Sequence, residues 1–297
     1  MEIDGRTTIV GVIGYPIAHS LSPRIHNAAI QAWGINWCYL PFQVAPEDLE
    51  KAIEGMRGLG IRGLNITVPH KQAVMRFLDW VSPEASAIGA VNTILNEGGR
   101  LSGYNTDVEG ILAALRFGAG LERLPEKVVV LGAGGAARGI VYALATVTDV
   151  KHITILNRTI PKAERLAAEM EKMAKEKTEI EGKGLDGETV RAELREAGPA
   201  GCETTHRAGL VINATPVGMY PNVDCSPIED PSVFHPGLVL YDTIYNPEET
   251  KLMRLARSQG AKCFNGLDML VYQGAKSLEI WTGKKVPVEV MKKAVTS

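Results

Sequence analysis

The segment Asn65-Ile66-Thr67-Val68-Pro69-His70-Lys71 places a lysine at a corner between two predicted elements. Apolar and polar residues alternate up to Val68, as in a half-buried strand. Pro69 then ends the strand, because proline has no N–H for the ladder, and a helical pattern follows. A lysine at such a corner can point into a cleft without being fully buried and can handle a proton there. A lone lysine, in contrast, is more often a solvated surface residue.

Two downstream motifs carry small and polar residues where an ordinary core would need bulk. The first is Gly89-Ala90-Val91-Asn92-Thr93 and the second is Gly103-Tyr104-Asn105-Thr106-Asp107. They flank a predicted hairpin turn at residues 96–100. Together with the lysine segment, they predict the walls of one polar site, in which Asp107 is a carboxylate partner for Lys71.

An N-terminal loop adds two hydroxyl groups, on Ser20 and Ser22, just before a predicted helix. One interpretation is that Ser22 is the N-cap and Pro23 the first helical residue. The other is that both hydroxyls bind a carboxylate near the helix N-terminus. His19 and His26 flank the loop, and we interpret both as structural.

Bulk composition excludes several classes of protein. The 297 residues are 45% hydrophobic and 22% charged with a net charge of −2, which is typical of a globular domain and gives no basic field for nucleic acid or an anionic membrane. No signal peptide or membrane span is expected. The four cysteines are scattered, which predicts no metal site, no disulfide framework and a cytoplasmic location. They are Cys38, Cys202, Cys225 and Cys263.

Strand and helix patterns alternate along the first part of the chain. Apolar runs predict strands at residues 7–13, 37–44 and 63–68, and an amphipathic helix covers residues 46–59. This alternation predicts an α/β fold with a mainly parallel sheet. A second α/β unit is expected to start near Pro125.

The second unit opens with a dinucleotide-binding fingerprint. A buried strand at residues 127–131 runs directly into the sequence Gly132, Ala133, Gly134, Gly135, Ala136, which opens a helix. This is the G-x-G-x-x-A pattern in its strand–turn–helix context. The glycines permit a tight turn and let a pyrophosphate approach the helix N-terminus, so we expect a Rossmann-type domain.

The next strand ends in residues that favour NADP over NAD. Residues 152–156 form this strand, and Asn157, Arg158 and Thr159 follow it. An NAD site places an acidic residue there for the ribose hydroxyl. Arg158 can instead bind a 2′-phosphate through two parallel hydrogen bonds, and Lys162 adds a positive charge.

The remainder of the second unit yields two further expectations. Residues 162–199 are rich in both charge signs, and we interpret them as a solvated insertion made of a helix, a flexible turn and a second helix. Strands near residues 210 and 239 end in polar segments, the second of which contains Thr243 and Tyr245. Strand ends of this kind should lie where a nicotinamide binds.

These motifs, in this order, resemble the shikimate dehydrogenase family over nearly the whole chain. The segments that carry the resemblance are residues 20–23, 65–71, 89–93, 105–107, 132–136, 157–159, 213–218 and 266–273. The charged insertion after Thr159 departs from the shorter members of the family.

The resemblance implies a substrate domain, residues 1–107 plus 266–297, to which the C-terminal helices return, and an NADP domain, residues 108–265. It also implies reversible reduction of 3-dehydroshikimate to shikimate, a step towards chorismate and the aromatic amino acids, by a monomer or homodimer. The implied substrate-binding residues are Ser20 and Ser22 for the carboxylate, Thr67, Asn92, Tyr245 and Gln273 around the ring, and Lys71 and Asp107 at the reacting oxygen. Gly266 would lie near the nicotinamide, with Thr243 as a further cofactor contact.

Elementary chemistry supports the same catalytic pair. Hydride addition to a ketone requires that the developing alkoxide be protonated or stabilised. Protonated Lys71 could supply the proton, and neutral Lys71 could take it in reverse. Burial favours a neutral lysine and a neighbouring carboxylate favours a charged one, and Asp107 could instead act mainly by orienting Lys71. His70 is adjacent, but neighbours along a chain often point apart, so we rank it below Lys71.

Three other functions stay open at this point. The first is the same chemistry on quinate, which carries an extra ring hydroxyl. The second is a non-catalytic dinucleotide-binding sensor, which the presence of both Lys71 and Asp107 disfavours. The third is a tetrahydrofolate dehydrogenase, to which the serine-rich loop at Ser20 and Ser22 is poorly suited.

Overall fold

The computed structural model describes residues 3–195 and 209–296. The chain forms two compact units, which we call unit 1 (Met1–Ile111 with Asp268–Ser297) and unit 2 (Leu112–Leu267). The unit boundaries fall at 111/112 and 267/268, where the sequence suggested 107/108 and 265/266. The first boundary is later because the start of helix α4 (Asp107–Ala113) packs on helix α9 (Leu267–Thr282): a Cβ at Gly110 would lie 2.8 Å from the Gln273 Cβ.

Unit 1 is built on a six-stranded mixed sheet with the strand order β2-β1-β3-β5-β6-β4. Strand β1 is parallel to both β2 and β3, and β6 is parallel to β4, whereas β5 is antiparallel to β3 and β6. The strands are β1 (Thr8–Gly14), β2 (Trp37–Gln43), β3 (Gly63–Ile66), β4 (Trp80–Val81), β5 (Thr93–Glu97) and β6 (Arg100–Tyr104). The expected hairpin is therefore β5–β6, while β4 is too short to show a period in the sequence.

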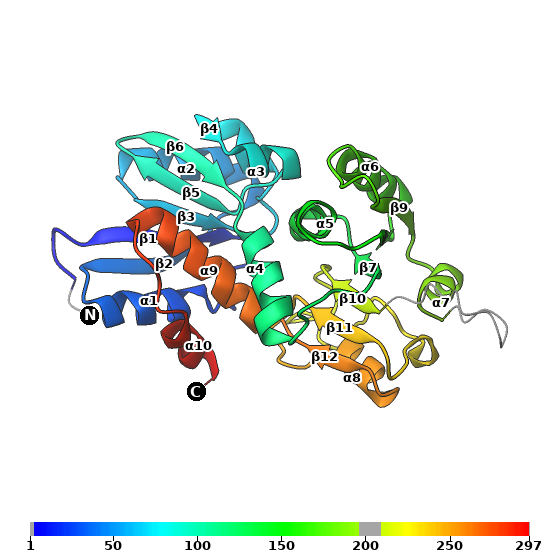
Figure 1. Ribbon diagram of the computed structural model, residues 1–297. Coiled ribbons are helices and arrows are strands. Elements are labelled where there is room, and N and C mark those ends of the chain that lie inside the picture. The colour runs from blue at the N-terminus through cyan, green and yellow to red at the C-terminus, as the bar shows by residue number, and fades with distance from the viewer. Residues whose placement is uncertain (1–2, 196–208, 297) are drawn as a thin grey trace. The chain divides into compact units, whose positions relative to one another are not determined.

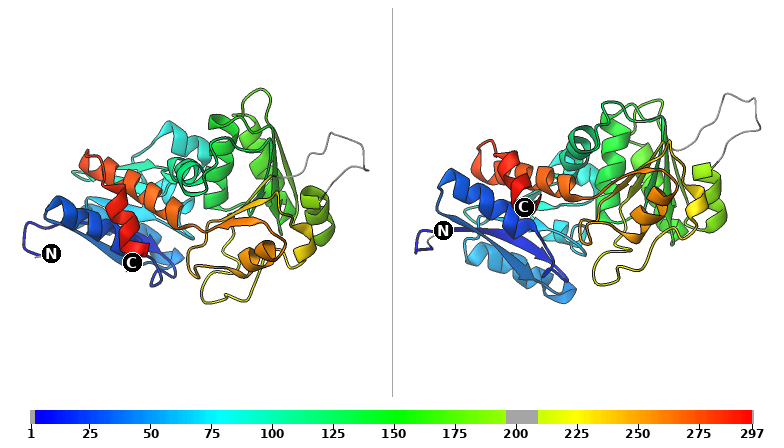
Figure 2. Two further views of the ribbon diagram at one scale, coloured as in Figure 1. Left: turned by 60° about the horizontal axis from the view of Figure 1, so that its bottom comes forward. Right: turned by 90° about the horizontal axis from the view of Figure 1, so that it is seen from below.

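Helices cover both faces of the unit 1 sheet (Figure 1). One face carries α1 (Ser22–Trp33), α9 and α10 (Val288–Thr296), and the other carries α2 (Leu49–Gly58), as the right-hand view of Figure 2 shows edge-on. The remaining turns of helix near this sheet are η1 (Pro46–Asp48), η2 (Ala73–Phe77) and α3 (Pro83–Ile88). Side chains alternate accordingly, because Val12 packs among α1 and α9 while Ile13 packs with α2.

Helix α9 is anchored in unit 1 by Trp281, which is fully buried. Its indole N–H donates to the carbonyl oxygen of Ile94 at 2.9 Å. A Cβ at Gly63 would overlap the indole ring, so this β3 position must be glycine for the helix to lie so close. The expected return of the C-terminal helices to the N-terminal sheet is thereby confirmed.

Unit 2 has a six-stranded, fully parallel sheet with the order β12-β11-β10-β7-β8-β9. The strands are β7 (Lys127–Leu131), β8 (His152–Asn157), β9 (Glu179–Gly184), β10 (Leu210–Asn213), β11 (Val239–Asp242) and β12 (Lys262–Phe264). In chain order this is the 3-2-1-4-5-6 arrangement of a Rossmann fold, in which ligands bind where the order reverses, beside β7 and β10. The predicted Rossmann-type domain is confirmed.

Helices of unit 2 lie on both faces of its sheet (Figure 1). They are α5 (Gly135–Val147), α6 (Ile160–Glu171), α7 (Gly187–Arg195) and α8 (Lys251–Ser258), with the short turns η3 (Ala114–Gly118) and η4 (Pro231–Val233). Residues from α7 and α8 share one hydrophobic core with Val129, Val211 and Leu240 of the sheet.

The expectation of a flexible turn inside residues 162–199 is wrong. That stretch contains strand β9, which pairs with β8 as the outermost strand of the sheet. A Cβ at Gly182 would overlap the backbone of Ala163, so this glycine permits β9 to lie against α6. Helix α7 is tied to the sheet by Glu193, which forms ion pairs with Lys127 and Lys183. Residues 196–199 of the predicted insertion lie outside the described residues.

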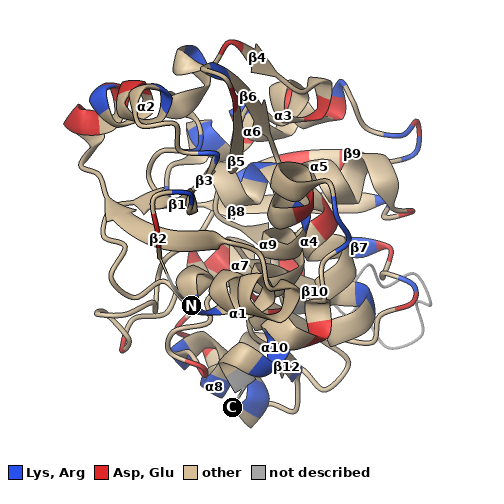
Figure 3. Ribbon diagram, turned by 90° about the vertical axis from the view of Figure 1, so that its left-hand side faces the viewer, with Lys and Arg blue, Asp and Glu red and all other residues tan. Residues whose placement is uncertain are grey.

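Charged residues of both signs are distributed over the surface of the chain (Figure 3). Both charge signs occur side by side on single helices such as α2 (Figure 3). Among the helices of the described residues, none combines the length and the apolar character needed to cross a membrane. Cys38, Cys225 and Cys263 are free thiols, and Cys202 lies outside the described residues.

Candidate functional site

Lys71 and Asp107 form an ion pair inside unit 1. Lys71 Nζ lies 2.5 Å from Asp107 Oδ2, and the two side chains are only 12% and 4% exposed. Lys71 follows the end of β3, and Asp107 is the first residue of α4. The side chain of Asn105 accepts the backbone N–H of Asp107 at 3.0 Å and so fixes the start of that helix. A carboxylate at a helix N-terminus is also stabilised by the helix dipole.

The amide of Asn92 holds the second oxygen of this carboxylate. Asn92 Nδ2 donates to Asp107 Oδ1 at 2.9 Å, while Asn92 Oδ1 accepts the backbone N–H of Thr106 at 2.8 Å. The second contact fixes which way the amide points. Gln273 of α9 reaches the same group, since Asn92 Nδ2 lies 3.4 Å from Gln273 Oε1. Four residues from four segments of unit 1 thus meet around one carboxylate.

A buried network of neutral polar groups supports this centre. Asn65 Nδ2 donates to Ser277 Oγ at 2.8 Å, and Asn65 Oδ1 accepts the Tyr39 hydroxyl at 2.8 Å. Ser277 Oγ in turn lies 2.7 Å from the Thr93 hydroxyl. We call the following set the polar network: Tyr39, Asn65, Asn92, Thr93, Thr106 and Ser277. All six are buried, and such networks rigidify a site when each member is satisfied.

The N-terminal loop lies beside this centre along the sheet edge. β1 and β3 are parallel neighbours, so their carboxyl ends meet, and a Cβ at Gly14 would lie 2.5 Å from Thr67 Cγ2. Ser22 is not the N-cap of α1, because the cap residue is Leu21 and no side chain caps the helix. Instead Ser20 Oγ accepts the backbone N–H of Ser22 at 3.3 Å. The N-cap interpretation of Ser22 is therefore wrong.

The histidines near the centre have structural partners. The ring Nε2 of His70 lies 2.8 Å from the carbonyl oxygen of Val44, so this nitrogen carries the proton and the ring is turned to the β2 side. The ring of His26 stacks on Tyr39 with centroids 4.0 Å apart. Burial lowers the pKa of His26 to about 4 and also lowers that of His19. These contacts agree with the structural role expected for His26 and with the low rank of His70, whereas the structural role of His19 stays a prediction.

The glycine fingerprint of unit 2 has the geometry expected of a phosphate-binding turn. Gly132 follows β7 with a φ of 104°, which only glycine adopts readily. Helix α5 begins at Gly135, with Gly134 as an N-cap that has no side chain. A Cβ placed on Gly134 would meet no protein atom within 4 Å, so the space above the turn is open. Ala133 and Ala136 complete the turn, and a pyrophosphate fits a helix N-terminus of this kind.

Two exposed cationic residues, Arg158 and Lys162, lie shortly after the end of β8. Asn157 Nδ2 donates to the carbonyl oxygen of Thr159 at 2.9 Å and shapes the turn that precedes α6. The side chains of Arg158 and Lys162 are exposed, and among the residues that the structure describes they have no hydrogen-bond or ion-pair partner. Two free cations beside a fingerprint turn fit the 2′-phosphate of NADP.

The ends of β10 and β11 form a second buried polar cluster. Asp242 is fully buried and accepts the amide of Asn213 at 2.9 Å. Thr243 follows it, and the Thr243 N–H donates to the Asn213 carbonyl oxygen at 3.0 Å. A Cβ at Gly266 would overlap the Thr243 carbonyl group, so Gly266 is required for packing within unit 2. Tyr245 lies two residues further along this segment.

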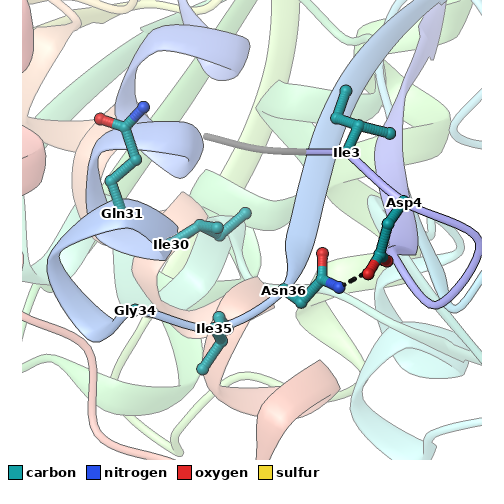
Figure 4. A pocket seen from close by; sticks show the side chains of 7 residues that line it. All are labelled: Ile3, Asp4, Ile30, Gln31, Gly34, Ile35 and Asn36. Carbon is teal, nitrogen blue, oxygen red and sulfur yellow. Dashed lines mark hydrogen bonds between the residues drawn. The ribbon is translucent and has the colours of Figure 1, made fainter.

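A cavity of about 580 Å³ lies elsewhere in unit 1 and contains none of the predicted site residues. Figure 4 shows its walls, where Asn36 donates to Asp4 (2.8 Å) beside Ile3 and Ile35. Within residues 3–195 and 209–296, no group of His, Cys, Asp and Glu side chains could hold a metal ion.

Family models match three consecutive parts of the chain. They are described as a shikimate dehydrogenase substrate binding domain at residues 12–94, a shikimate / quinate 5-dehydrogenase at 113–183, and a shikimate 5'-dehydrogenase C-terminal domain at 266–296. A shikimate dehydrogenase (NADP(+)) of Methanopyrus kandleri is 46% identical over 297 residues, which is 99% of this chain and 97% of the relative. This chain belongs to the shikimate dehydrogenase family.

Two solved structures are similar to this chain over nearly its whole length. A shikimate 5-dehydrogenase of Thermus thermophilus in complex with NADP(H) and shikimate is 34% identical, with a TM-score of 0.78 and coverage of 97% of this chain and 98% of the other. A quinate dehydrogenase of Corynebacterium glutamicum in complex with NAD is 29% identical, with a TM-score of 0.81 and coverage of 98% and 99%.

Several residues that shape the site were not among the predicted ones. Ser277 lies one helical turn after Gln273, and this i, i+4 spacing on a predicted helix could have revealed it. Tyr39 sits in an apolar strand, where nothing in the sequence marks its hydroxyl as a hydrogen-bond donor to Asn65. Asn213 and Asp242 belong to the predicted strand ends, but their mutual hydrogen bond requires the β10–β11 register to be known.

Proposed function

We propose that this protein is an NADP-dependent oxidoreductase that interconverts shikimate and 3-dehydroshikimate. The observation that carries the proposal is the buried Lys71–Asp107 pair, held by Asn92 and Gln273 in a chain of the shikimate dehydrogenase family. Unit 1 binds the substrate and unit 2 binds NADP. The reaction would be a step towards chorismate and the aromatic amino acids.

Lys71 manages the proton of the reaction. When bound, NADPH supplies the hydride that converts the ketone carbon into a carbinol carbon. Protonated Lys71 donates a proton to the developing alkoxide oxygen, and neutral Lys71 takes that proton back in the oxidation of shikimate. The Lys71 side chain, which is 12% exposed, then exchanges its proton with solvent. Asp107 orients the Lys71 ammonium group towards the reacting oxygen, because the Asn92 amide fixes the position of the Asp107 carboxylate.

The other substrate contacts follow from the position of each residue. Ser20 and Ser22 lie at the start of α1, where hydroxyl groups and backbone N–H groups favour a carboxylate. Thr67, which directly follows β3, and Gln273 of α9 bind ring hydroxyl groups, and Tyr245 is a further ring contact. Asn92 acts both on the ring and on Asp107.

The NADP contacts combine the turn after β7 with the end of β8. Backbone N–H groups at Gly134, Gly135 and Ala136 receive the pyrophosphate. Arg158 and Lys162, with Asn157 and Thr159, hold the 2′-phosphate. Thr243 and Gly266 line the nicotinamide end. We further propose a cytoplasmic monomer or homodimer, and the free thiols of Cys38, Cys225 and Cys263 suit a reducing compartment.

A spectrophotometric assay tests the proposal directly. The purified protein is mixed with shikimate and either NADP⁺ or NAD⁺, and the formation of the reduced nucleotide is followed. We expect turnover with a strong preference for NADP⁺. No turnover with shikimate and either nucleotide would contradict the proposal and return the non-catalytic sensor to consideration.

Quinate is the second candidate substrate. The family model over residues 113–183 covers both shikimate and quinate enzymes, and the quinate dehydrogenase of C. glutamicum has a similar structure. The same assay with quinate separates the two, because a quinate-specific enzyme would show a higher kcat/KM on quinate than on shikimate.

A further inference from the structure

A buried carboxylate in unit 2 has no part in the proton chemistry proposed above. Asp242 ends β11 and its side chain has no exposed surface. Among the described residues, no lysine, arginine or histidine forms an ion pair with it. A carboxylate is rarely buried without a cation unless hydrogen bonds satisfy it, so its partners indicate its task.

Three donors from three segments converge on Asp242. Oδ1 accepts the Asn213 amide at 2.9 Å and the Ile244 backbone N–H at 3.1 Å, and Oδ2 accepts the Thr250 hydroxyl at 2.7 Å. Asn213 and Asp242 are paired in the β10–β11 register, so both lie at the same edge of the sheet. Thr250 is the N-cap of α8. One side chain therefore ties together two strand ends and a helix start.

The segment that Asp242 holds contains two residues of the proposed site, Thr243 and Tyr245. The Thr243 N–H donates to the Asn213 carbonyl oxygen at 3.0 Å. The Ile244 carbonyl oxygen accepts the Gly266 N–H at 3.0 Å, with Gly266 packed directly on Thr243. Without the Asp242 carboxylate, the first turn of this segment would lose its side-chain support.

We propose that Asp242 is a positioning residue for the reaction, whose ionised carboxylate fixes the segment that presents Thr243 to the nicotinamide and Tyr245 to the substrate. This inference rests on the proposed function. It assigns a kinetic role to a buried acid that touches neither the substrate nor the cofactor.

The protonation state of Asp242 gives this role a pH signature. An ionised carboxylate only accepts hydrogen bonds and so suits three donors, whereas a protonated one carries an O–H that displaces one of them. Burial raises the pKa of Asp242 to about 6, against the opposing effect of its three hydrogen bonds. The titratable groups around it are the Cys263 thiol on β12 and the Arg257–Glu249 pair at α8.

The pH dependence of the KM for shikimate and that of the free energy of unfolding together separate a positioning role of Asp242 from an effect on stability. Because the folded-state pKa lies above the ordinary value of 3.8, this group does not destabilise the fold as the pH falls from 7 to 5. The KM for shikimate should nevertheless rise as the pH falls through about 6. The protonated carboxyl group would lose one of its three hydrogen bonds, and the segment that carries Thr243 and Tyr245 would be held less firmly.

The primary test compares Asp242→Asn with wild-type enzyme in kcat, in KM for shikimate between pH 5 and pH 9, and in the Kd of NADP⁺. We expect Asp242→Asn to raise the KM for shikimate about tenfold at pH 8, because one charge-assisted hydrogen bond is lost. The Kd of NADP⁺, set mainly at β7 and β8, should change less than about threefold. The rise of KM below about pH 6 should vanish in the variant.

Asp230→Asn is the matched control. Asp230 is a hydrogen-bonded carboxylate of the same unit, at the start of η4, and its pKa is lowered to about 2 by its hydrogen bonds with Ser232 and Arg191. We expect wild-type KM and a wild-type pH profile for this variant.

Thr250 provides a second, independent pair of variants. Thr250→Val removes the donor to Asp242 Oδ2 while keeping the side-chain shape, and Thr250→Ser keeps the hydroxyl. We expect a several-fold rise in KM for Thr250→Val and near wild-type KM for Thr250→Ser.

The outcomes distinguish the inference from the proposed function. If wild-type enzyme does not oxidise shikimate, the proposed function is wrong. The positioning role is wrong if the wild-type enzyme is active and Asp242→Asn has the wild-type KM for shikimate and the same rise of KM below about pH 6. If Asp242→Asn does not fold, Thr250→Val decides, and equal KM values for Thr250→Val and Thr250→Ser overturn the inference.

Discussion

The two units present their functional groups in opposite ways. In unit 1 the proposed catalytic pair Lys71–Asp107 is almost fully buried and joined to a network of further buried groups. In unit 2 only part of the proposed NADP site is exposed: Gly134 faces open space, and the exposed side chains of Arg158 and Lys162 have no hydrogen-bond or ion-pair partner among the described residues. Unit 1 therefore holds a centre whose polar groups already have partners, whereas the exposed groups of unit 2 are available to bind phosphate oxygens. Substitutions in the buried centre of unit 1 should affect catalysis and folding together, whereas those at the exposed residues Arg158 and Lys162 of unit 2 should affect NADP binding alone.

Lys71→Ala should have the largest effect. We expect kcat to fall by roughly a hundredfold or more, because proton transfer to the alkoxide is lost, with a smaller change in KM. Since Asp107 is left without its cation in a site where it is only 4% exposed, we also expect a measurable loss of stability. Steady-state kinetics on the folded fraction and urea unfolding separate the two effects.

Lys51→Ala is the matched control for this variant, because the Lys51 side chain is 80% exposed in its pair with Asp48. It should leave both kcat and the unfolding midpoint unchanged. A Lys71→Ala enzyme with near-normal kcat and raised KM would mean that Lys71 only positions the substrate, and Asp107 would be the next residue to replace.

Arg158→Ala tests the exposed side of the comparison. Loss of one bidentate phosphate contact should weaken NADP⁺ by roughly ten- to a hundredfold, or about 1.5–3 kcal/mol, and leave NAD⁺ binding nearly unchanged. Fluorescence titration with each nucleotide measures both constants. Arg254→Ala on α8 serves as the control. Equal losses for both nucleotides would show that Arg158 does not read the 2′-phosphate.

Ser277→Ala tests the polar network without touching the ion pair. The Asn65 amide would lose an acceptor 2.8 Å away inside a buried site, so we expect a loss of about 1–3 kcal/mol in the free energy of unfolding. The exposed Ser258→Ala on α8 should change it by less than about 0.5 kcal/mol. Urea unfolding that gave the same value for both variants would show that the network contributes little to stability.

Lys162→Ala should have the smallest effect. The free energy of unfolding should stay within about 0.5 kcal/mol of wild type, because the side chain is exposed and unpaired among the described residues. NADP⁺ affinity should fall only a few-fold, because a lysine acts on phosphate as a single point charge. A drop as large as that of Arg158→Ala would shift the main phosphate contact to Lys162.

Much of the architecture could be predicted from the sequence because it depends on local patterns. The β7 strand, the glycine turn and α5 follow from an apolar run and the φ requirement of Gly132. Strand β9 could not be predicted in this way, since only Ile180 is a buried apolar residue there and Gly182 suggested flexibility. Its reason for being a strand is the close approach of α6, which is a tertiary fact.

In the candidate site, too, the features set by local sequence could be predicted and those set by tertiary contacts could not. Lys71, Asp107 and Asn92 could be proposed from motif position, and the structure brings them together. Ser22 was open to a wrong interpretation, because a Ser-Pro pair fits an N-cap by sequence alone while the helix takes Leu21 as its cap. The Lys71 side chain is 12% exposed, as expected for a lysine that is not fully buried, but its ion pair with Asp107 depends on the tertiary contact between the end of β3 and the start of α4.

The position of α9 in the chain has a consequence for how unit 1 is made. Its core joins Val10 and Tyr39, near the start of the chain, to Val271 and Trp281, near the end. During synthesis, all of unit 2 leaves the ribosome before α9 does. Unit 2 can therefore fold while α9 has not yet packed on its face of the unit 1 sheet. The earliest strands therefore spend the longest time with apolar side chains open to water. The sheet that is synthesised first is therefore the last to be fully covered by helices. A nascent chain halted before α9 would expose that sheet as an aggregation-prone surface.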